Sequence, residues 1–103
     1  MNITYKGLAL RDLEEKRDYL SNTLKNKSAA QKLITLILHA VSLLADNPKM
    51  GTPLSSKYEV DIDIRYLVVS KQLVFYRIVD DTYIPVIRIL DGRQDYMAIL
   101  FQE

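Results

Sequence analysis

Three β-rich runs separated by very short spacers dominate the C-terminal half of the chain. They cover residues 62–70, 73–79 and 83–90, and Lys71-Gln72 and Asp80-Asp81-Thr82 separate them. Spacers of two or three residues join antiparallel strands in hairpins, because a parallel connection needs a dozen or more residues. The three runs therefore predict an antiparallel meander.

In the N-terminal half, the apolar residues recur at different spacings. Ile3 and Tyr5 alternate with polar neighbours, which predicts a short opening strand over residues 2–6. Beyond it, leucines recur every three or four residues, as on one face of a helix, and predict a first helix over about residues 8–25. Lys16 interrupts the middle of this stripe. The leucines of the stripe are Leu10, Leu13, Leu20 and Leu24.

A capping box predicts the start of a second helix. In Ser28-Ala29-Ala30-Gln31 the serine and glutamine side chains can satisfy backbone N–H groups at a helix start, so the helix is expected to begin near Ala29. Its wide apolar stripe ends at Asp46-Asn47-Pro48, because proline disfavours helix in the residue before it. The tight connection between the two helices predicts an antiparallel hairpin.

The order of these elements predicts one α+β domain over residues 1–103. A loop over residues 46–57, rich in Pro, Gly and Ser, separates the helices from the strands. The tail over residues 93–101 is expected to be a short helix, with a fourth strand as the alternative. A chain of 103 residues has room for one core, and the helical hairpin is expected to pack on one face of the antiparallel sheet.

Alternation along the strands divides the sheet into two faces. A two-residue turn at Lys71-Gln72 predicts that Val68 lies opposite Phe75. In the same register Tyr66 lies opposite Arg77. The more apolar face is predicted to lie under the helices, and it holds Leu67, Val69, Val74, Tyr76, Ile78, Ile87 and Ile89.

The opposite face mixes arginines with large apolar side chains, which suits neither solvent nor a core. Apolar patches with tyrosine and arginine are typical of interaction surfaces, so this face is predicted to bind a partner. The alternative is that the C-terminal tail covers the face and that its arginines pair with Asp91 or Asp95. The members of this mixed face are Tyr66, Leu73, Phe75, Arg77, Ile84, Val86, Arg88 and Leu90.

Composition excludes several kinds of site. The chain has no cysteine, which excludes disulfides, thiolate zinc sites and a cysteine nucleophile. His39 is the single histidine and has no carboxylate three or four residues away, so it is interpreted as a helix-packing residue. No metal site and no cofactor are expected.

Hydropathy and charge indicate where the protein is located and which kinds of partner it can bind. The first 20 residues hold no apolar core of signal-peptide length, and the longest mostly apolar run, Leu33 to Ala45, is 13 residues, short of the ~20 that cross a bilayer. No membrane span and a cytoplasmic location are expected. Residues 1–57 carry nine Lys/Arg against five Asp/Glu, whereas residues 58–103 carry five against eight. The acidic second half disfavours nucleic-acid binding, which depends on basic surfaces.

Three stretches of the chain are similar to a known family. They are ALRDLEEKRDYL at 9–20, SAAQKLITLILHAVSLLADNPKMGTPL at 28–54 and QLVFYRIVDDTYIPVIRILDGRQDY at 72–96. The third is the most specific: a tyrosine-arginine strand, an acidic turn, an apolar strand with arginine, and Gly-Arg-x-Asp. With these stretches the chain resembles the RelE/ParE superfamily of bacterial type II toxins. Lys16 departs from the pattern, which usually has an aliphatic residue there.

The resemblance implies a toxin neutralised by a cognate antitoxin, with a role in plasmid stabilisation. It leaves two activities open, because RelE-like members cut mRNA on the ribosome and ParE-like members poison DNA gyrase. It also leaves the assembly open between a homodimer and a toxin–antitoxin hetero-oligomer.

The ribonuclease activity would need cationic groups around the scissile phosphate and a group that activates the 2′-hydroxyl. Leu73 stands where the family places a catalytic arginine, and three acidic residues, Glu59, Asp61 and Asp63, fall where it has a basic cluster. The sequence therefore favours a gyrase inhibitor, with the metal-independent ribonuclease as the alternative and the question of enzymatic activity open. The residues that would serve a ribonuclease are Arg65, Arg77, Arg93 and Tyr96.

Arg93 and Tyr96 are predicted to contact the target or the antitoxin, with Arg77 and Arg88 in support. Under the alternative interpretation Arg93 pairs with a neighbouring aspartate on the surface, where such a pair contributes ~0–1 kcal/mol, and Tyr96 packs on the core. The full set predicted to bind a partner is Tyr66, Leu73, Phe75, Arg77, Val86, Arg88, Arg93 and Tyr96.

Overall fold

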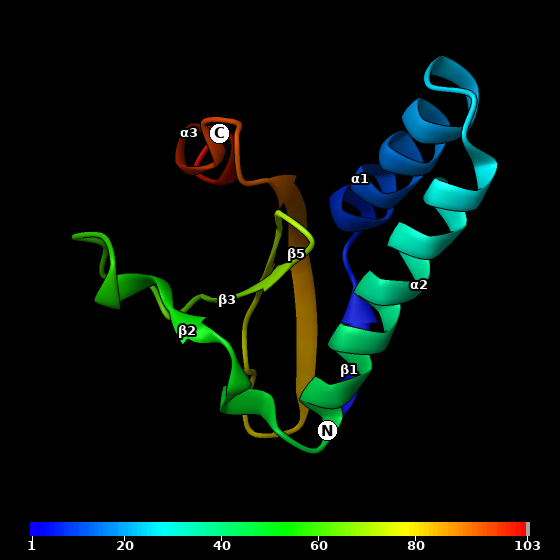
Figure 1. The fold of residues 1–103 in the computed structure, drawn as a ribbon. Coiled ribbons are helices and arrows are strands. Elements are labelled where there is room, and N and C mark those ends of the chain that lie inside the picture. The colour runs from blue at the N-terminus through cyan, green and yellow to red at the C-terminus, as the bar shows by residue number, and fades with distance from the viewer. Residues whose placement is uncertain (103) are drawn as a thin grey trace.

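A computed structural model describes residues 1–102 and shows the predicted α+β architecture (Figure 1). Over these residues the sheet has five strands in the order β1-β5-β4-β3-β2. The meander is antiparallel as predicted, but the opening strand β1 pairs in parallel with β5, so the sheet is mixed. The strands are β1 (Asn2–Tyr5), β2 (Thr52–Pro53), β3 (Arg65–Val69), β4 (Gln72–Tyr76) and β5 (Tyr83–Asp91).

The two N-terminal helices form the predicted hairpin. Helix α1 covers Gly7–Asp18 and continues as a π-helical turn over Tyr19–Thr23, and α2 covers Lys27–Ser42. The predicted capping box at Ser28 is wrong. Asn26 caps α2 instead, because its Oδ1 accepts a hydrogen bond from the Ala29 N–H at 3.0 Å.

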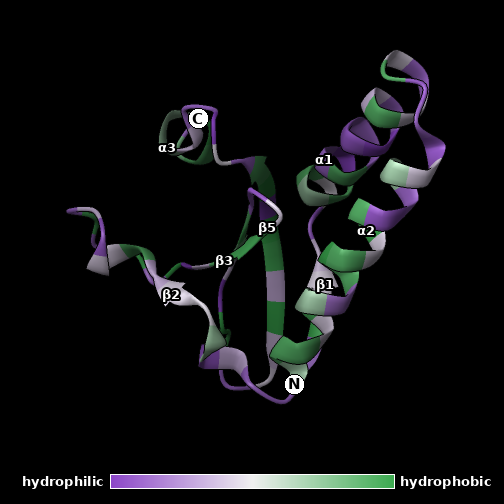
Figure 2. Cartoon of the chain, in the orientation of Figure 1, coloured by the Kyte–Doolittle hydropathy of each residue, from purple (hydrophilic) through white to green (hydrophobic). Residues whose placement is uncertain are grey.

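The main core lies between the helical hairpin and one face of the sheet. Helix α2 contributes Ile37 and Val41, the 3₁₀ turn Leu43–Ala45 that follows it contributes Leu44, and α1 contributes Ala9 and Leu13. The hydrophobic colouring of β5 along most of its length in Figure 2 matches its central place in the sheet. The sheet residues buried in this core are Val74, Tyr76, Ile84, Val86 and Ile89, with Leu67, Val69 and Ile78 packed against them.

The first hairpin turn lies one residue earlier than predicted. Ser70 and Lys71 form it with φ of 49° and 67°, so Tyr66 pairs with Phe75 rather than with Arg77. Two positive φ values match the twist of the flanking strands, even though neither residue is glycine. The register therefore differs from the prediction by two residues, which leaves every side chain on its predicted face because the period of a strand is two.

A β-bulge changes the faces of β5. Phe75 pairs with Arg88 but Tyr76 pairs with Val86, so β5 carries one extra residue at this point. The prediction that Ile84 and Val86 share the mixed face is wrong, because both are fully buried in the main core. Ile87, predicted to lie under the helices, packs on the opposite side of the sheet.

A second core covers that opposite side. The loop over residues 54–64 and the C-terminal helix α3 (Tyr96–Leu100) lie over it, and Figure 1 shows α3 on the far side of β5 from the hairpin. The tail is thus a helix, as predicted. The buried members of the second core are Leu54, Ile64, Leu73, Phe75 and Leu90.

The predicted loop over residues 46–57 contains short elements of its own. Two 3₁₀ turns, Pro48–Met50 and Leu54–Ser56, flank β2, and β3 begins only at Arg65 rather than at residue 62. Tyr76 holds this segment on the sheet, because its hydroxyl accepts the Gly51 N–H at 2.8 Å and donates to the Pro48 carbonyl at 2.7 Å.

Candidate functional site

Helix α1 covers an edge of the sheet that β1 leaves open. β1 pairs with β5 as far as Val86, and beyond that point α1 lies along the edge of β5. Asp12 Oδ2 accepts the Ile89 N–H at 2.9 Å, and Lys16 Nζ donates to the Ile89 carbonyl at 2.6 Å. Two side chains one helical turn apart therefore satisfy the backbone groups that a neighbouring strand would otherwise pair.

Asp12 also holds Arg88. The Arg88 Nε and Nη2 groups each donate to a different oxygen of Asp12, both at 2.9 Å, which makes a two-pronged ion pair. Asp12 is 4% exposed, and the Arg88 side chain is 18% exposed. The hydrogen bonds from Arg88 to Asp12 raise the pKa of the guanidinium. Arg88, predicted to contact a partner, is thus engaged inside the chain.

The place of Lys16 in the fold accounts for a charged residue where the family pattern usually has an aliphatic one, because its ammonium group bonds to β5. Burial lowers the pKa of its ammonium group, although the charges of Asp12 and Asp91 act in the opposite direction. The interruption in the apolar stripe of α1 is therefore the point where the helix bonds to β5.

A second charged cluster lies at the end of β5. Arg93 Nε and Nη2 donate to Asp91 at 2.9 and 2.7 Å, and Gln72 Nε2 donates to Asp91 Oδ2 at 3.3 Å. The hydrogen bonds from the Arg93 side chain hold the pKa of Asp91 well below its usual range. Arg93 thus adopts the alternative pairing with Asp91, and its side chain stays 76% exposed. Its contact with a target remains a prediction.

The two clusters line one groove of about 1010 Å³, called the hairpin groove here. One wall is the helical hairpin, which exposes more than half of Tyr19 and of Leu24. Gln72 lies in the lining, 7% exposed, and its Oε1 has no hydrogen-bond partner among residues 1–102. The lining residues are Asp12, Glu15, Lys16, Tyr19, Leu20, Leu24, Ala29, Leu33, Ser70, Gln72, Arg88, Leu90, Asp91, Arg93, Gln94 and Ile99.

The structure does not expose the apolar members of the predicted interaction surface. Leu73 and Phe75 are buried in the second core, and Val86 is buried in the main core. Tyr66 is half-buried against the Phe75 ring, with the ring centres 6.2 Å apart. The expectation that these side chains face solvent is wrong, because residues 54–64 and α3 cover the face that they share and the bulge moves Val86 to the other.

Of the residues named for a ribonuclease, Arg65 pairs with Tyr76, the neighbour of Arg77, whereas Arg93 follows Asp91 near the other end of β4. Arg65 donates to the Gly51 carbonyl at 2.8 Å near β2, and Arg77 is exposed just after β4. Tyr96 packs against Phe75 with ring centres 5.8 Å apart, and its hydroxyl hydrogen-bonds to that of Tyr58. The structure therefore does not bring the three arginines and Tyr96 together.

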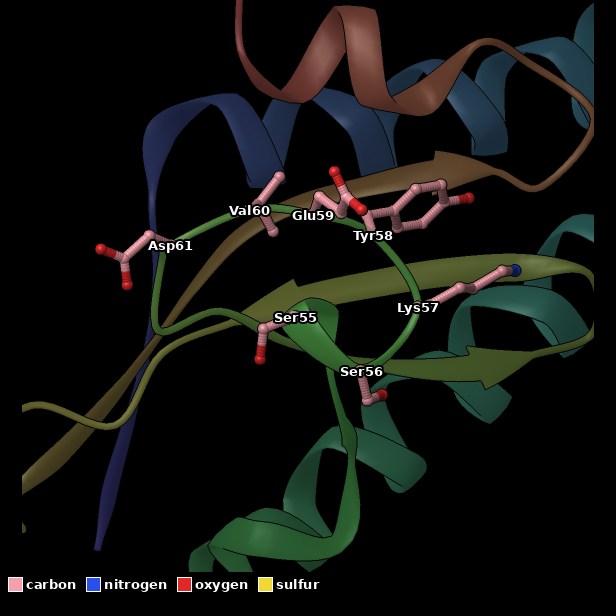
Figure 3. A pocket seen from close by; sticks show the side chains of 7 residues that line it. All are labelled: Ser55, Ser56, Lys57, Tyr58, Glu59, Val60 and Asp61. Carbon is pink, nitrogen blue, oxygen red and sulfur yellow. The ribbon is translucent and has the colours of Figure 1, made fainter.

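Sequence reasoning missed Tyr58, which sits in a loop with no periodic signal. Figure 3 shows the recess around it, which has a volume of about 440 Å³ and is lined by residues 55–61 alone. The two charged ends of this lining, Lys57 and Asp61, lie far apart in the view, so the side chains do not converge on one point.

The placement of acidic and histidine side chains and the hydropathy of the helices bear on two further sequence predictions. Over residues 1–102 no group of three or more His, Asp or Glu side chains is placed to hold a metal ion. By length and composition, the helical segment Lys27–Ala45 would reach across a bilayer. Within the fold its Ile37, Val41 and Leu44 pack on the sheet.

Comparison with known proteins identifies the family. A family model described as the ParE toxin of type II toxin-antitoxin system, parDE, matches residues 3–96. Among solved structures, a chain of the chromosomal ParDE toxin–antitoxin system from P. aeruginosa superposes with a TM-score of 0.71. The two sequences are 22% identical, and the match covers 88% of this chain and 95% of that one. No curated protein matches the sequence. The structural likeness confirms the fold and the family model spans nearly the whole chain, so this protein belongs to the ParE toxin family of type II toxin–antitoxin systems.

Proposed function

We propose that this toxin is neutralised by a cognate antitoxin and that its target in the cytoplasm is DNA gyrase. The family match supports the toxin class, and the ParDE pair of the P. aeruginosa structure supports a partner protein of the antitoxin kind. The choice between gyrase and messenger RNA rests on the arrangement of the arginines.

The single observation that carries the choice is that the four ribonuclease candidates do not converge. Gln72, which pairs with Asp91 beside Arg93, and Arg77 stand five residues apart along the chain. At roughly 3.4 Å per residue this places the backbones of Gln72 and Arg77 about 17 Å apart, near opposite ends of β4. Arg65 is tied to a backbone carbonyl. Stabilisation of one transition state needs donors aimed at one group, so this arrangement favours the gyrase target over the ribonuclease.

Charge supports the same choice. Residues 58–103, which contribute β3, β4 and β5, carry eight Asp/Glu against five Lys/Arg. Binding to RNA draws much of its affinity from neutralised phosphates, so an acidic half-chain favours a protein target.

Purified protein tests the proposal in two parallel assays. We expect inhibition of gyrase supercoiling or accumulation of cleaved DNA complexes, with ribosome-bound message left intact in a translating extract. Cleavage of the message with gyrase unaffected would replace the proposal with the ribonuclease alternative.

Two arginine variants test the predicted contact. We expect Arg93→Ala to weaken gyrase inhibition about tenfold or more if Arg93 contacts the target, since arginines are common binding hot spots. Arg17→Ala is the matched control, because Arg17 is also exposed and also lies beside an aspartate, Asp18, at 3.6 Å. Equal activity of both variants, with folding verified by circular dichroism, would show that Arg93 forms only a surface ion pair.

A further inference from the structure

The side of α2 that faces away from the sheet carries large apolar side chains. Leu36 and Leu43 are 43% and 46% exposed, and they lie seven residues apart, two turns along the same side of the helical segment. Ile37 and Val41 point the other way and are buried on the sheet. Figure 1 shows α2 at the outer side of the molecule, with α1 and the sheet on its inner side. An apolar spacing of seven residues is typical of helices that pack along one another.

Charges of opposite sign lie at the two ends of this face. Lys32 lies one turn before the first leucine and Asp46 three residues after the second, and both side chains are exposed. Asp46 stays on the same side because residues three apart in the 3₁₀ turn after α2 eclipse each other. His39 lies midway and is exposed as well, rather than packed within the hairpin. These five residues form the outer seam: Lys32, Leu36, His39, Leu43 and Asp46.

The two charges of the outer seam have no partner in the described part of the chain. Neither Lys32 nor Asp46 forms an ion pair among residues 1–102. They stand 14 positions apart in the sequence, and at 1.5 Å per residue this separates them by about 21 Å along the helix axis. They therefore cannot reach each other within one copy of the chain.

The outer seam is symmetric about its centre. Lys32 and Asp46 each lie seven residues from His39, and the two leucines lie three and four residues from it. When two copies of α2 pack antiparallel about a two-fold axis at His39, each Lys32 lies opposite Asp46 of the other copy. Leu36 of one copy then lies beside Leu43 of the other. A two-fold axis makes each of these contacts twice, as in an isologous dimer.

The charges also select the kind of partner. An anionic lipid surface would attract Lys32 but repel Asp46. A second copy of the chain satisfies both charges at once, because it presents the same two residues in the reverse order.

We propose that the chain forms a homodimer through the outer seam, with two α2 helices packed antiparallel and two Lys32–Asp46 ion pairs between the copies. The inference gives a surface to the homodimer that the sequence left open, and it depends on neither the antitoxin nor gyrase. Contact along part of one helix is small for a protein interface, so we expect a weak dimer with a dissociation constant in the micromolar range.

Matched leucine variants test the apolar part of the outer seam. Sedimentation of the full chain over a range of concentrations measures the dissociation constant of the dimer. We expect Leu36→Glu to weaken the dimer about tenfold or more, because burial of a leucine is lost. Leu38→Glu is the control and should stay within about twofold of the parent, since Leu38 is 42% exposed on the same helix but lies about 160° around its axis from Leu36.

A charge exchange tests the antiparallel arrangement. Lys32→Glu and Asp46→Lys should each weaken the dimer about tenfold, because two attractive pairs become repulsive. The double variant should return to within about threefold of the parent, since it restores both pairs with their signs reversed. Only contact between copies can produce this rescue, because the two residues are too far apart within one copy. A double variant as weak as either single variant would overturn the pairing.

Other outcomes overturn the inference without touching the toxin assignment. A parent chain that stays monomeric up to millimolar concentration would show that the outer seam does not join two copies. Equal dimerisation of Leu36→Glu and Leu38→Glu would place the interface elsewhere. If the parent is monomeric and Leu36→Glu weakens binding of the protein encoded by the adjacent open reading frame, the seam belongs to that protein instead. Circular dichroism verifies folding, and Leu43→Glu replaces Leu36→Glu if the latter does not fold.

Discussion

The attachment of α1 to β5 through Asp12 leads to a strong prediction about stability. Asp12→Ala removes the acceptor of three hydrogen bonds, two from Arg88 and one from the Ile89 N–H. It leaves a guanidinium that is only 18% exposed without its counter-charge, and it leaves the N–H of a fully buried residue without a partner. Loss of one member of a buried ion pair costs about 3–5 kcal/mol.

The lower end of that range applies, because the remaining exposure of Arg88 lets its guanidinium turn partly to water. A loss of about 3 kcal/mol is a large share of the roughly 5–15 kcal/mol that stabilises a typical domain. At about 4–8 °C per kcal/mol for a chain of this size, the midpoint of thermal unfolding should fall by about 12–24 °C. Circular dichroism during heating and urea titration would measure both quantities.

Asp18→Ala is the matched control for this measurement. Asp18 lies in the same helix and faces Arg17 at 3.6 Å, but its side chain is 60% exposed. Exposed pairs contribute ~0–1 kcal/mol, so this variant should unfold within a few degrees of the parent. A shift for Asp12→Ala as small as that of Asp18→Ala would refute the reasoning.

A double variant separates the two costs of the substitution. Asp12→Leu combined with Arg88→Met replaces the ion pair by apolar side chains, which often restores stability in a buried site. We expect most of the lost stability to return. If it does not, the unpaired Ile89 N–H accounts for the loss rather than the unpaired charge.

Three further predictions concern stability elsewhere. Gly51→Ala should cost about 1–3 kcal/mol in a urea titration, because the added Cβ would lie 2.5 Å from the hydroxyl oxygen of Tyr76, which is fully buried; an unchanged midpoint would show that the loop gives way. Tyr76→Phe should cost about 1–3 kcal/mol, since it leaves the Gly51 N–H and the Pro48 carbonyl without their partner, and a loss well below this range would indicate that water replaces the hydroxyl. Arg93→Gln should be slightly less stable than the parent at neutral pH. Because Arg93 holds the folded-state pKa of Asp91 below its unfolded value of about 3.9, the difference should be complete above that pH and vanish as the pH falls through the folded-state pKa. Unfolding curves at several acidic pH values test this, and a difference that persists at the lowest pH would contradict the assignment.

The sequence by itself determined the two long helices, the meander, the C-terminal helix, their order and the resemblance to the family. The alternation over residues 62–90 and the short spacers within it suffice for the antiparallel meander, because the hydrophobic period and the turn length are local properties. The same is true of the helical hairpin and of the C-terminal helix, whose apolar side chains recur at helical spacing. The motif over residues 72–96 pointed to the toxin superfamily without any tertiary information.

Only the tertiary structure decided which side chains remain on the surface. A bulge in β5 moves Val86 into the main core, and a bulge depends on how two strands pair rather than on the composition of either one. Phe75 is buried because α3 and a distant loop cover it. Asp12 and Arg88, 76 residues apart, meet because α1 lies along the edge of β5 that β1 leaves open. Contacts of this kind join segments far apart in the chain, so no local pattern carries them.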